Sequence, residues 1–151
     1  MRPVFLTILA LGLLGCVNEH AFEVDIVAGD PVPPEVVSWE LRLTQLEPTE
    51  ECPTAEMSAS AARYARLLHV QTFTGVGMAI GEIPAGRWAV AVLARDATCG
   101  VQLYGCTEAN IAPETFSPIV ITVRSASITE LCGDCRTCES GGCSPDLSTC
   151  D

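Results

Sequence analysis

The sequence predicts an all-β fold: an antiparallel β-sandwich of about seven strands, followed by a cysteine-rich, disulfide-stapled C-terminal tail. Three observations favour this fold. Short segments of alternating apolar and polar residues recur along the chain, turns rich in proline or glycine separate them, and little of the chain has the periodicity of an amphipathic helix. A chain of 151 residues can bury one sizeable core between two layers of such strands.

The first two predicted strands flank a proline-rich turn. In residues 22–26, Phe, Val and Ile alternate with Glu and Asp, which is typical of a half-buried strand. Residues 30–34 contain three prolines, whose missing amide donor and fixed φ interrupt a strand. Residues 37–44 show the most regular alternation in the chain, with Trp39 among the apolar positions and Glu40 among the polar ones. We therefore predict a strand on each side of the turn.

The middle of the chain has a less regular pattern. Residues 47–60 form a longer excursion that contains Cys52 and that can form a short helix after Thr54. Residues 64–74 fit either a helix or a strand, and we favour a strand from about Leu67.

The remaining predicted strands include the expected centre of the sheet. Residues 76–80 are bounded by glycines and are consistent with a short strand. After a proline–glycine turn, residues 87–95 are apolar on both sides between their terminal arginines, which predicts a strand inside a sheet or between layers. Residues 100–106 predict a further short strand or hairpin arm, and residues 118–124 predict the last core strand.

The segment that leads into the expected central strand resembles a known family. Residues 83–92 read Ile-Pro-Ala-Gly-Arg-Trp-Ala-Val-Ala-Val, which is similar to the leucine-proline-x-glycine-x-aromatic-x-valine signature of carboxypeptidase-regulatory-like, or prealbumin-like, domains. The resemblance implies a β-sandwich in which the turn starts a central strand and the aromatic residue, Trp88, enters the core. It also implies a structural, adhesive or carrier module and says almost nothing of a particular activity.

The N-terminus resembles a bacterial lipoprotein signal peptide. Residues 1–15 combine a positive start with a short apolar run, which is too short to span a bilayer because a spanning helix needs about 20 apolar residues. The run ends in Leu13-Leu14-Gly15-Cys16, which resembles a lipobox. The resemblance implies cleavage before Cys16, acylation of that cysteine, and a tether over residues 16–21. The alternative is an ordinary secretory signal with an incidental cysteine.

The same resemblance implies a location. Lipidation of Cys16 would anchor the protein to a membrane outside the cytoplasm, and two acylated positions on one residue suffice for stable anchoring. Val17 follows the cysteine where an Asp tends to retain Gram-negative lipoproteins at the inner membrane. The protein is therefore expected in the cell envelope, in the outer membrane of a Gram-negative bacterium.

The charge of the chain excludes one class of partner. The formal net charge is −11, and all eight basic residues are arginines. Such an acidic surface repels phosphate backbones and anionic lipid, so no nucleic-acid partner is expected and the acyl group must supply the membrane anchor. The acidity is typical of a soluble, self-repelling surface, and a cation-binding surface is the alternative.

Cysteine number and spacing predict disulfides. Lipidation of Cys16 would leave eight cysteines, and an even number in an exported chain is typical of a disulfide framework. The expected disulfide cysteines are Cys52, Cys99, Cys106, Cys132, Cys135, Cys138, Cys143 and Cys150. Cys99 and Cys106 are predicted to bridge a hairpin. The alternative joins Cys52 to one of them and ties the 47–60 excursion to the edge of a strand.

The chain is expected to divide into a β-sandwich domain over residues 22–128 and a cysteine-rich tail over residues 129–151. The tail has almost no aliphatic residues, so it cannot fold without cross-links or a metal. Its cysteine spacing does not match a ferredoxin or a paired Cys-x2-Cys zinc site, and metal ligation needs thiolates that an oxidising compartment removes. We therefore predict disulfides, with no metal and no cofactor, and keep a metal-binding or redox tail as the alternative.

No catalytic residues are predicted. The histidines outside the leader are His20 in the tether and His69 in an expected strand, and neither has a companion at ligand spacing. The chain also lacks a Gly-x-Ser-x-Gly motif and a phosphate-binding glycine loop. The expected function is that of a non-enzymatic, lipid-anchored envelope protein with a structural or protein-interaction role. Its expected partners are the membrane, through Cys16, and an envelope protein.

Overall fold

The computed structural model describes most of the chain from residue 22 onward. The described residues are 22–59, 67–73, 78–80, 83–112, 117–129, 132, 136–146 and 148. The predictions for the leader, Cys16, His20, Cys135 and Cys150 lie outside them.

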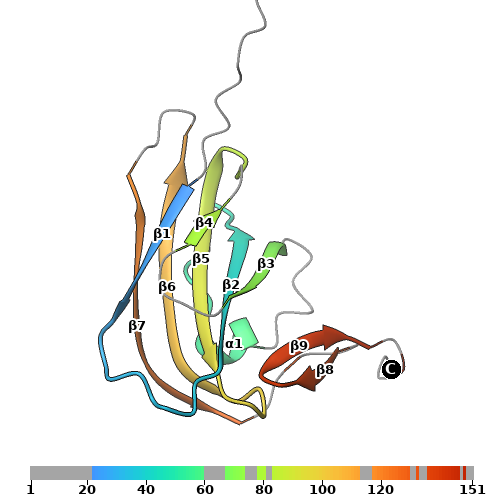
Figure 1. Ribbon diagram of the computed structural model, residues 1–151. Coiled ribbons are helices and arrows are strands. Elements are labelled where there is room, and N and C mark those ends of the chain that lie inside the picture. Colours follow the sequence, from blue (N-terminus) through green and yellow to red (C-terminus); the bar gives the residue numbers. More distant parts are fainter. Residues whose placement is uncertain are drawn as a thin grey trace, which may run out of the picture.

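The described residues form strands and one short helix (Figure 1). The elements in chain order are β1 (Phe22–Ala28), β2 (Ser38–Gln45), α1 (Ala55–Ala59), β3 (Leu67–Phe73), β4 (Met78–Ile80), β5 (Gly86–Arg95), β6 (Val101–Ile111), β7 (Ile119–Ile128), β8 (Arg136–Glu139) and β9 (Gly142–Pro145). No helix in this part of the chain has the length and apolar character needed to cross a bilayer.

Seven of the described strands form one mixed sheet, and the other two form a hairpin. The order in the large sheet is β3-β2-β5-β6-β7-β1-β4, and β8 pairs with β9. Neighbouring strands are antiparallel except β1 and β7, which run parallel. The all-antiparallel pairing that we predicted is therefore wrong for this pair. Alternation along a strand specifies which side chains share a face, but it carries no information on the direction of a neighbouring strand.

The predicted β-rich fold is confirmed, but two separate packed sheets are not. Strand β7 connects the two parts of the sheet, because residues 119–123 pair with β1 and residues 124–128 pair with β6. The sheet curls, so that Val24 of β1 lies in the same buried cluster as residues of β2 and β5. One continuous, curled sheet therefore encloses the core.

The core lies mainly on one face of β2 and β5. The cluster includes Trp39 and Leu41 from β2 and Trp88 and Val92 from β5. Both tryptophans are buried, as predicted, and the Trp88 indole Nε1 donates a hydrogen bond to the Pro84 carbonyl at 2.9 Å. The turn thus satisfies the one polar group that the buried Trp88 brings into the core.

Strand β5 is buried on both faces, as its composition predicts. It pairs with β2 on one side and β6 on the other. On the face away from Trp88, Leu93 packs in a second buried cluster with Ala59 of α1 and Val101 of β6. The predicted interior position of this strand is therefore confirmed.

Several boundaries differ from those predicted. Strand β3 begins at Leu67, as expected, and α1 follows Thr54, whose Oγ1 accepts a hydrogen bond from the Met57 amide at 3.3 Å. Strands β6 and β7 both run several residues beyond the predicted segments. The extensions contain polar residues that interrupt the alternating pattern, so the pattern does not predict them. A paired strand can continue there because its open face tolerates polar side chains.

Candidate functional site

Three disulfides join the described cysteines. They are Cys52–Cys106, Cys99–Cys138 and Cys132–Cys143. The predicted Cys99–Cys106 bridge is wrong. Cys99 lies in the turn before β6 and Cys106 lies within β6, so the extended backbone between them covers about 20 Å at ~3.3 Å per residue. Disulfides need Cα atoms about 4.4–6.8 Å apart, which this stretch of strand cannot provide.

The Cys52–Cys106 disulfide matches the alternative that remained open in the sequence. It joins the 47–60 excursion to β6 with a Cα–Cα distance of 6.0 Å. Beside it, the Glu108 carboxylate accepts hydrogen bonds from the Cys52 amide at 3.2 Å and from Arg87 at 2.5 Å. These contacts hold the excursion that carries α1 against the sheet.

The tail docks on the sheet through the β8–β9 hairpin. The Cys99–Cys138 disulfide bonds β8 to the turn between β5 and β6. The Ser38 hydroxyl of β2 donates a hydrogen bond to the Gly141 carbonyl at 2.5 Å, across 103 positions of sequence. Gly141 is buried at a φ of 83°, and a Cβ there would lie 2.8 Å from the Asp96 carbonyl oxygen. Position 141 therefore requires glycine, because of the positive φ and because a Cβ would lie too close to the Asp96 carbonyl oxygen.

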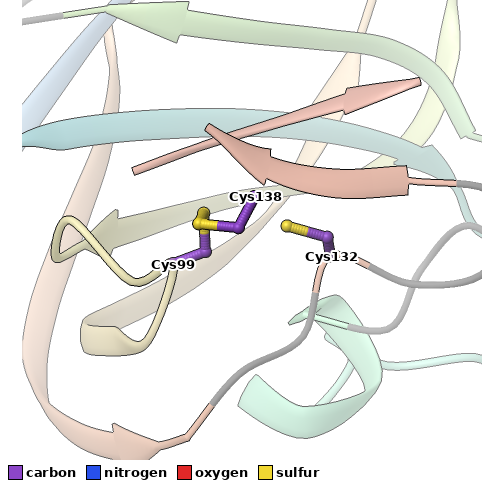
Figure 2. Close-up of side chains that lie close together, drawn as sticks. All are labelled: Cys99, Cys132 and Cys138. Carbon is purple, nitrogen blue, oxygen red and sulfur yellow. A yellow bond between two sulfur atoms is a disulfide. The ribbon is translucent and has the colours of Figure 1, made fainter. Parts of the chain in front are cut away.

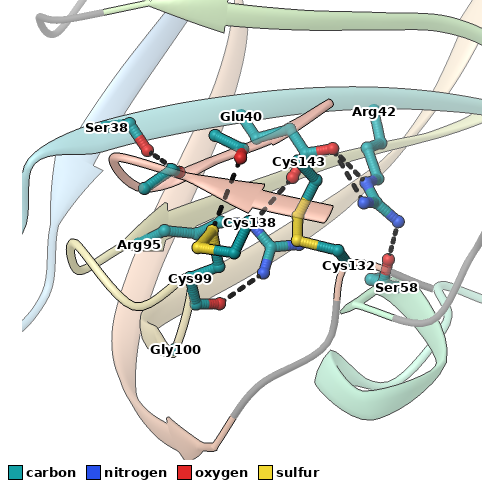
Figure 3. A network of polar contacts seen from close by, with 12 residues as sticks. Ser38, Glu40, Arg42, Ser58, Arg95, Cys99, Gly100, Cys132, Cys138 and Cys143 are labelled. Atoms are coloured by element: carbon teal, nitrogen blue, oxygen red, sulfur yellow. Dashed lines mark hydrogen bonds and ion pairs between the residues drawn. A yellow bond between two sulfur atoms is a disulfide. The ribbon is translucent and has the colours of Figure 1, made fainter. Parts of the chain in front are cut away.

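The hairpin and α1 cover charged side chains that the strand alternation places opposite the core. Figure 3 shows this network. Glu40, Arg42 and Arg95 are 4 %, 3 % and 1 % exposed. The Glu40 carboxylate pairs with Arg42 Nη2 at 2.7 Å and with Arg95 Nε at 2.9 Å. We define these three residues as the buried charge group.

The two arginines also donate to backbone carbonyls of neighbouring segments. Arg95 Nη1 donates to the Cys99 carbonyl at 2.7 Å, and Arg42 Nη1 donates to the Ser58 carbonyl of α1. A buried charge needs both an opposite charge and hydrogen bonds to compensate for its lost hydration. The buried charge group therefore ties β2, β5, α1 and the Cys99 turn together.

The ionisation of this group follows from its pairing. Burial raises the pKa of Glu40, but the charges of Arg42 and Arg95 outweigh it, so that its pKa lies below its ordinary value. Burial lowers the pKa of Arg42, and the Glu40 carboxylate opposes that shift. With all three residues ionised, the buried charge group has two positive charges and one negative charge.

Four sulfur atoms gather beside the buried charge group. The Sγ atoms of Cys99, Cys132 and Cys138 lie within 4.8 Å of one another, and Figure 2 shows the Cys132 sulfur close to the Cys99–Cys138 disulfide. Cys143 is bonded to Cys132, which makes this a four-sulfur cluster. Cys99 and Cys132 are buried, while Cys138 is exposed.

The four-sulfur cluster is the candidate site, and its chemistry depends on oxidation state. As thiolates, such closely spaced sulfurs would suit a thiophilic metal. In the pairing observed here, all four sulfurs are in disulfides, which are not thiolate ligands. The chemistry open to this arrangement is therefore thiol–disulfide exchange.

A separate cavity lies beside α1. It has a volume of about 230 Å³ and extends from Arg42 and Thr44 of β2 to the Cys52–Pro53 segment. Its lining includes the apolar Leu46 and Met57 together with Glu51. Mixed lining of this kind does not select one ligand chemistry.

The structure brings together only some of the predicted site residues. It unites Cys99, Cys132, Cys138 and Cys143, places Cys52 and Cys106 in a separate disulfide, and places His69 on β3. The sequence analysis missed Glu40, Arg42 and Arg95 as partners. A usable signal was present, because Arg95 ends a run that is apolar on both faces from Trp88 to Ala94. A charge at such a position requires a partner.

Comparison with known proteins adds nothing to the description of the fold or the cluster. No family model, curated protein or solved structure matches this chain.

Proposed function

We propose that this protein is a lipid-anchored component of the bacterial cell envelope with a structural or protein-interaction role and no enzymatic activity. The observation that carries the proposal is Leu13-Leu14-Gly15-Cys16 at the end of a short apolar run. The acyl chains on Cys16 hold the protein to the membrane, and the acidic remainder stays in solution beside it.

The cysteine chemistry supports an exported location. The described disulfides use six of the eight cysteines that remain without Cys16. Disulfides persist in oxidising compartments and are rare in the reducing cytosol. A small tail with few aliphatic residues, fastened by cross-links, suits a module that must stay folded outside the cytoplasm.

The resemblance to prealbumin-like domains supports the structural role. We propose that the curled sheet is a variant of that sandwich. Support comes from the turn at Pro84, from the burial of Trp88 and from the interior place of β5 in the sheet. Modules of this kind present surfaces or act as spacers, and an envelope protein is the partner proposed here.

Mass spectrometry of membrane-extracted protein tests the anchor. Full-length chain expressed in a Gram-negative host should lose residues 1–15 and gain the mass of a diacylglyceryl group and an amide-linked acyl chain. Cys16→Ala should accumulate as the uncleaved, unlipidated precursor, while Val17→Ala serves as the matched control and should be processed normally. Retention of Met1 on the wild-type protein, or an unmodified Cys16, would overturn the proposal.

Membrane fractionation tests the location. Wild-type protein should fractionate with the outer membrane, and Val17→Asp should move it to the inner membrane. Protease added to intact cells then separates the surface-exposed face from the periplasmic face. Wild-type protein in the inner membrane would contradict the outer-membrane assignment without affecting the lipid anchor.

A metal-binding or redox protein is the second candidate, and the four-sulfur cluster favours it. Thiol titration and elemental analysis of the purified protein separate the two candidates. A bound thiophilic metal with a matching number of reduced cysteines would support this second function. Absence of both would remove metal binding.

A further inference from the structure

The four-sulfur cluster is compatible with two sets of disulfides. The observed set is Cys99–Cys138 with Cys132–Cys143. In the β8–β9 hairpin, however, Cys138 and Cys143 are direct cross-strand partners. Opposed residues in an antiparallel pair have Cα atoms about 4.5–5.5 Å apart, which is within the range that a disulfide can bridge. The remaining two sulfurs, of Cys99 and Cys132, lie within 4.8 Å of each other.

We propose that this cluster is a thiol–disulfide exchange site at which an external thiol attacks Cys138 and converts the observed pairing into Cys99–Cys132 with Cys138–Cys143. The proposal rests on the positions of the four sulfurs and does not depend on the lipid anchor. The substrate class is a small thiol or an exposed thiol of another protein.

Exposure selects the point of attack. Cys138 is exposed on β8, whereas Cys99 is fully buried and Cys132 is 8 % exposed. An incoming thiolate therefore reaches the Cys138 sulfur first. It forms a mixed disulfide with Cys138, the Cys99–Cys138 bond breaks, and the electron pair of that bond leaves on Cys99 as a thiolate.

The surroundings of Cys99 favour this leaving group. Arg95 donates to the carbonyl of Cys99 itself, so a guanidinium charge lies against the same residue. The buried charge group contains two guanidinium groups, whose positive charges would stabilise a thiolate on Cys99. Positive neighbours stabilise thiolates, and a better leaving thiolate accelerates exchange.

The next two steps follow the arrangement of the sulfurs. The Cys99 thiolate attacks Cys132, and the Cys132–Cys143 bond breaks with a thiolate left on Cys143. Cys143 then attacks its cross-strand partner Cys138 and expels the external thiolate. Three disulfide bonds form and three break, so nothing is oxidised or reduced overall and the external thiol acts as a catalyst.

Exchange changes how the hairpin is held. In the observed pairing, Cys99 bonds β8 directly to the domain. In the exchanged pairing, Cys99 bonds Cys132, which precedes the hairpin in the chain, and the hairpin is closed on itself. Contacts such as the Ser38–Gly141 hydrogen bond would then have to hold the hairpin over Glu40 without a covalent bond.

Disulfide mapping of the full chain tests the proposal. We would incubate the protein with a mixture of reduced and oxidised glutathione, quench with acid, alkylate and map the bridged peptides. The Cys99–Cys132 and Cys138–Cys143 peptides should appear together in equal amounts, and glutathione should be found first on Cys138. Modification of Cys52 or Cys106 ahead of Cys138, or reduction without the new peptides, would overturn the proposal.

A pair of variants tests the relay without an added thiol. Cys143→Ser leaves Cys132 as a thiol beside the Cys99–Cys138 disulfide, so part of the protein should contain Cys99–Cys132 and a reduced Cys138. Cys106→Ser is the matched control, because it also leaves one thiol, on Cys52, but belongs to a different disulfide. Both variants would first be checked for a wild-type far-UV spectrum. A folded Cys143→Ser protein with no more Cys99–Cys132 peptide than the control would contradict the relay.

Discussion

The two faces of strands β2 and β5 are equally buried but are stabilised by different interactions. On one face, Trp39, Leu41 and Trp88 pack in the main core, where free energy scales with the apolar area removed from water. On the other face, the buried charge group and Ser38 lie beneath α1 and the hairpin. Burial there is tolerated only because each charge has a partner.

The comparison shows that the two faces of β2 and β5 are shielded from water in different ways. The apolar face is covered by the curl of its own sheet, which any well-packed apolar surface can provide. The polar face needs specific groups, among them a glycine 103 positions away from Ser38 and a disulfide that holds it there. Substitutions on the polar face should therefore lower stability by removing an ion-pair or hydrogen-bond partner. Substitutions on the apolar face should lower stability by leaving a cavity.

The largest effect is expected from Glu40→Gln. The substitution keeps the size of the side chain but leaves two buried guanidinium groups without a carboxylate, which should lower the free energy of unfolding by about 3–5 kcal/mol. Urea denaturation would measure the loss. Glu35→Gln, at an exposed position, is the control and should change stability by no more than ~0.5 kcal/mol. Equal effects of the two variants would contradict the ion-pair interpretation.

Leu41→Ala tests the opposite face of the same strand. Leu41 is fully buried, so its truncation should cost about 2–5 kcal/mol through lost transfer free energy and a residual cavity. Because Leu41 points to the opposite face of β2 from Glu40 and Arg42, the Cys99–Cys138 disulfide should be reduced by dithiothreitol under native conditions at close to the wild-type rate. Clearly faster reduction in Leu41→Ala than in the wild type would show that the two faces are not independent.

Gly141→Ala should loosen the hairpin. The added Cβ meets the Asp96 carbonyl oxygen at 2.8 Å, and the residue has a φ of 83°, so the cost should be about 1–3 kcal/mol. Hydrogen exchange should rise in β8, β9 and the Ser38 end of β2. Gly142→Ala is a matched control at the next position, where the nearest atom would lie 3.5 Å away. Similar exchange in both variants would mean that the hairpin does not dock through Gly141.

The smallest expected effect is a dependence of stability on acid. The pKa of Glu40 is lower in the folded protein than its ordinary value of 4.5, so the unfolded chain binds more protons in this range. The Glu40 contribution is present above pH 4.5 and is lost as the pH falls through the lower folded pKa. Thermal unfolding of wild type and Glu40→Gln over this range would measure it. The wild type should lose more stability than the variant, and parallel curves would contradict the assignment.

The strands could be predicted from the sequence where the pattern is local. The alternation in residues 37–44 and the double-sided apolar run in residues 87–95 predict β2, β5 and their core faces, because backbone geometry sets which side chains share a face. The disulfides were predictable as a class from cysteine parity, but only the alternative for Cys52 named a pair that the structure contains.

The cover on the polar face could not be predicted in this way. Glu40 and Arg42 alternate with apolar residues just as solvent-facing side chains do, and nothing near them in the chain indicates that Arg95, α1 and the hairpin enclose them. Their partners come from segments that only the folded chain brings together. The parallel direction of β1 and β7 and the pairing of Cys99 with Cys138 also depend on contacts between distant segments of the chain.

The sequence by itself determined the β-rich character, the faces of the central strands and the abundance of cross-links, since each follows from residue type and short-range spacing. Only the tertiary structure decided which cysteines meet, which strands run parallel and which charges are buried together. Those outcomes depend on distances between segments tens of residues apart, and such distances are set by the packing of the whole chain.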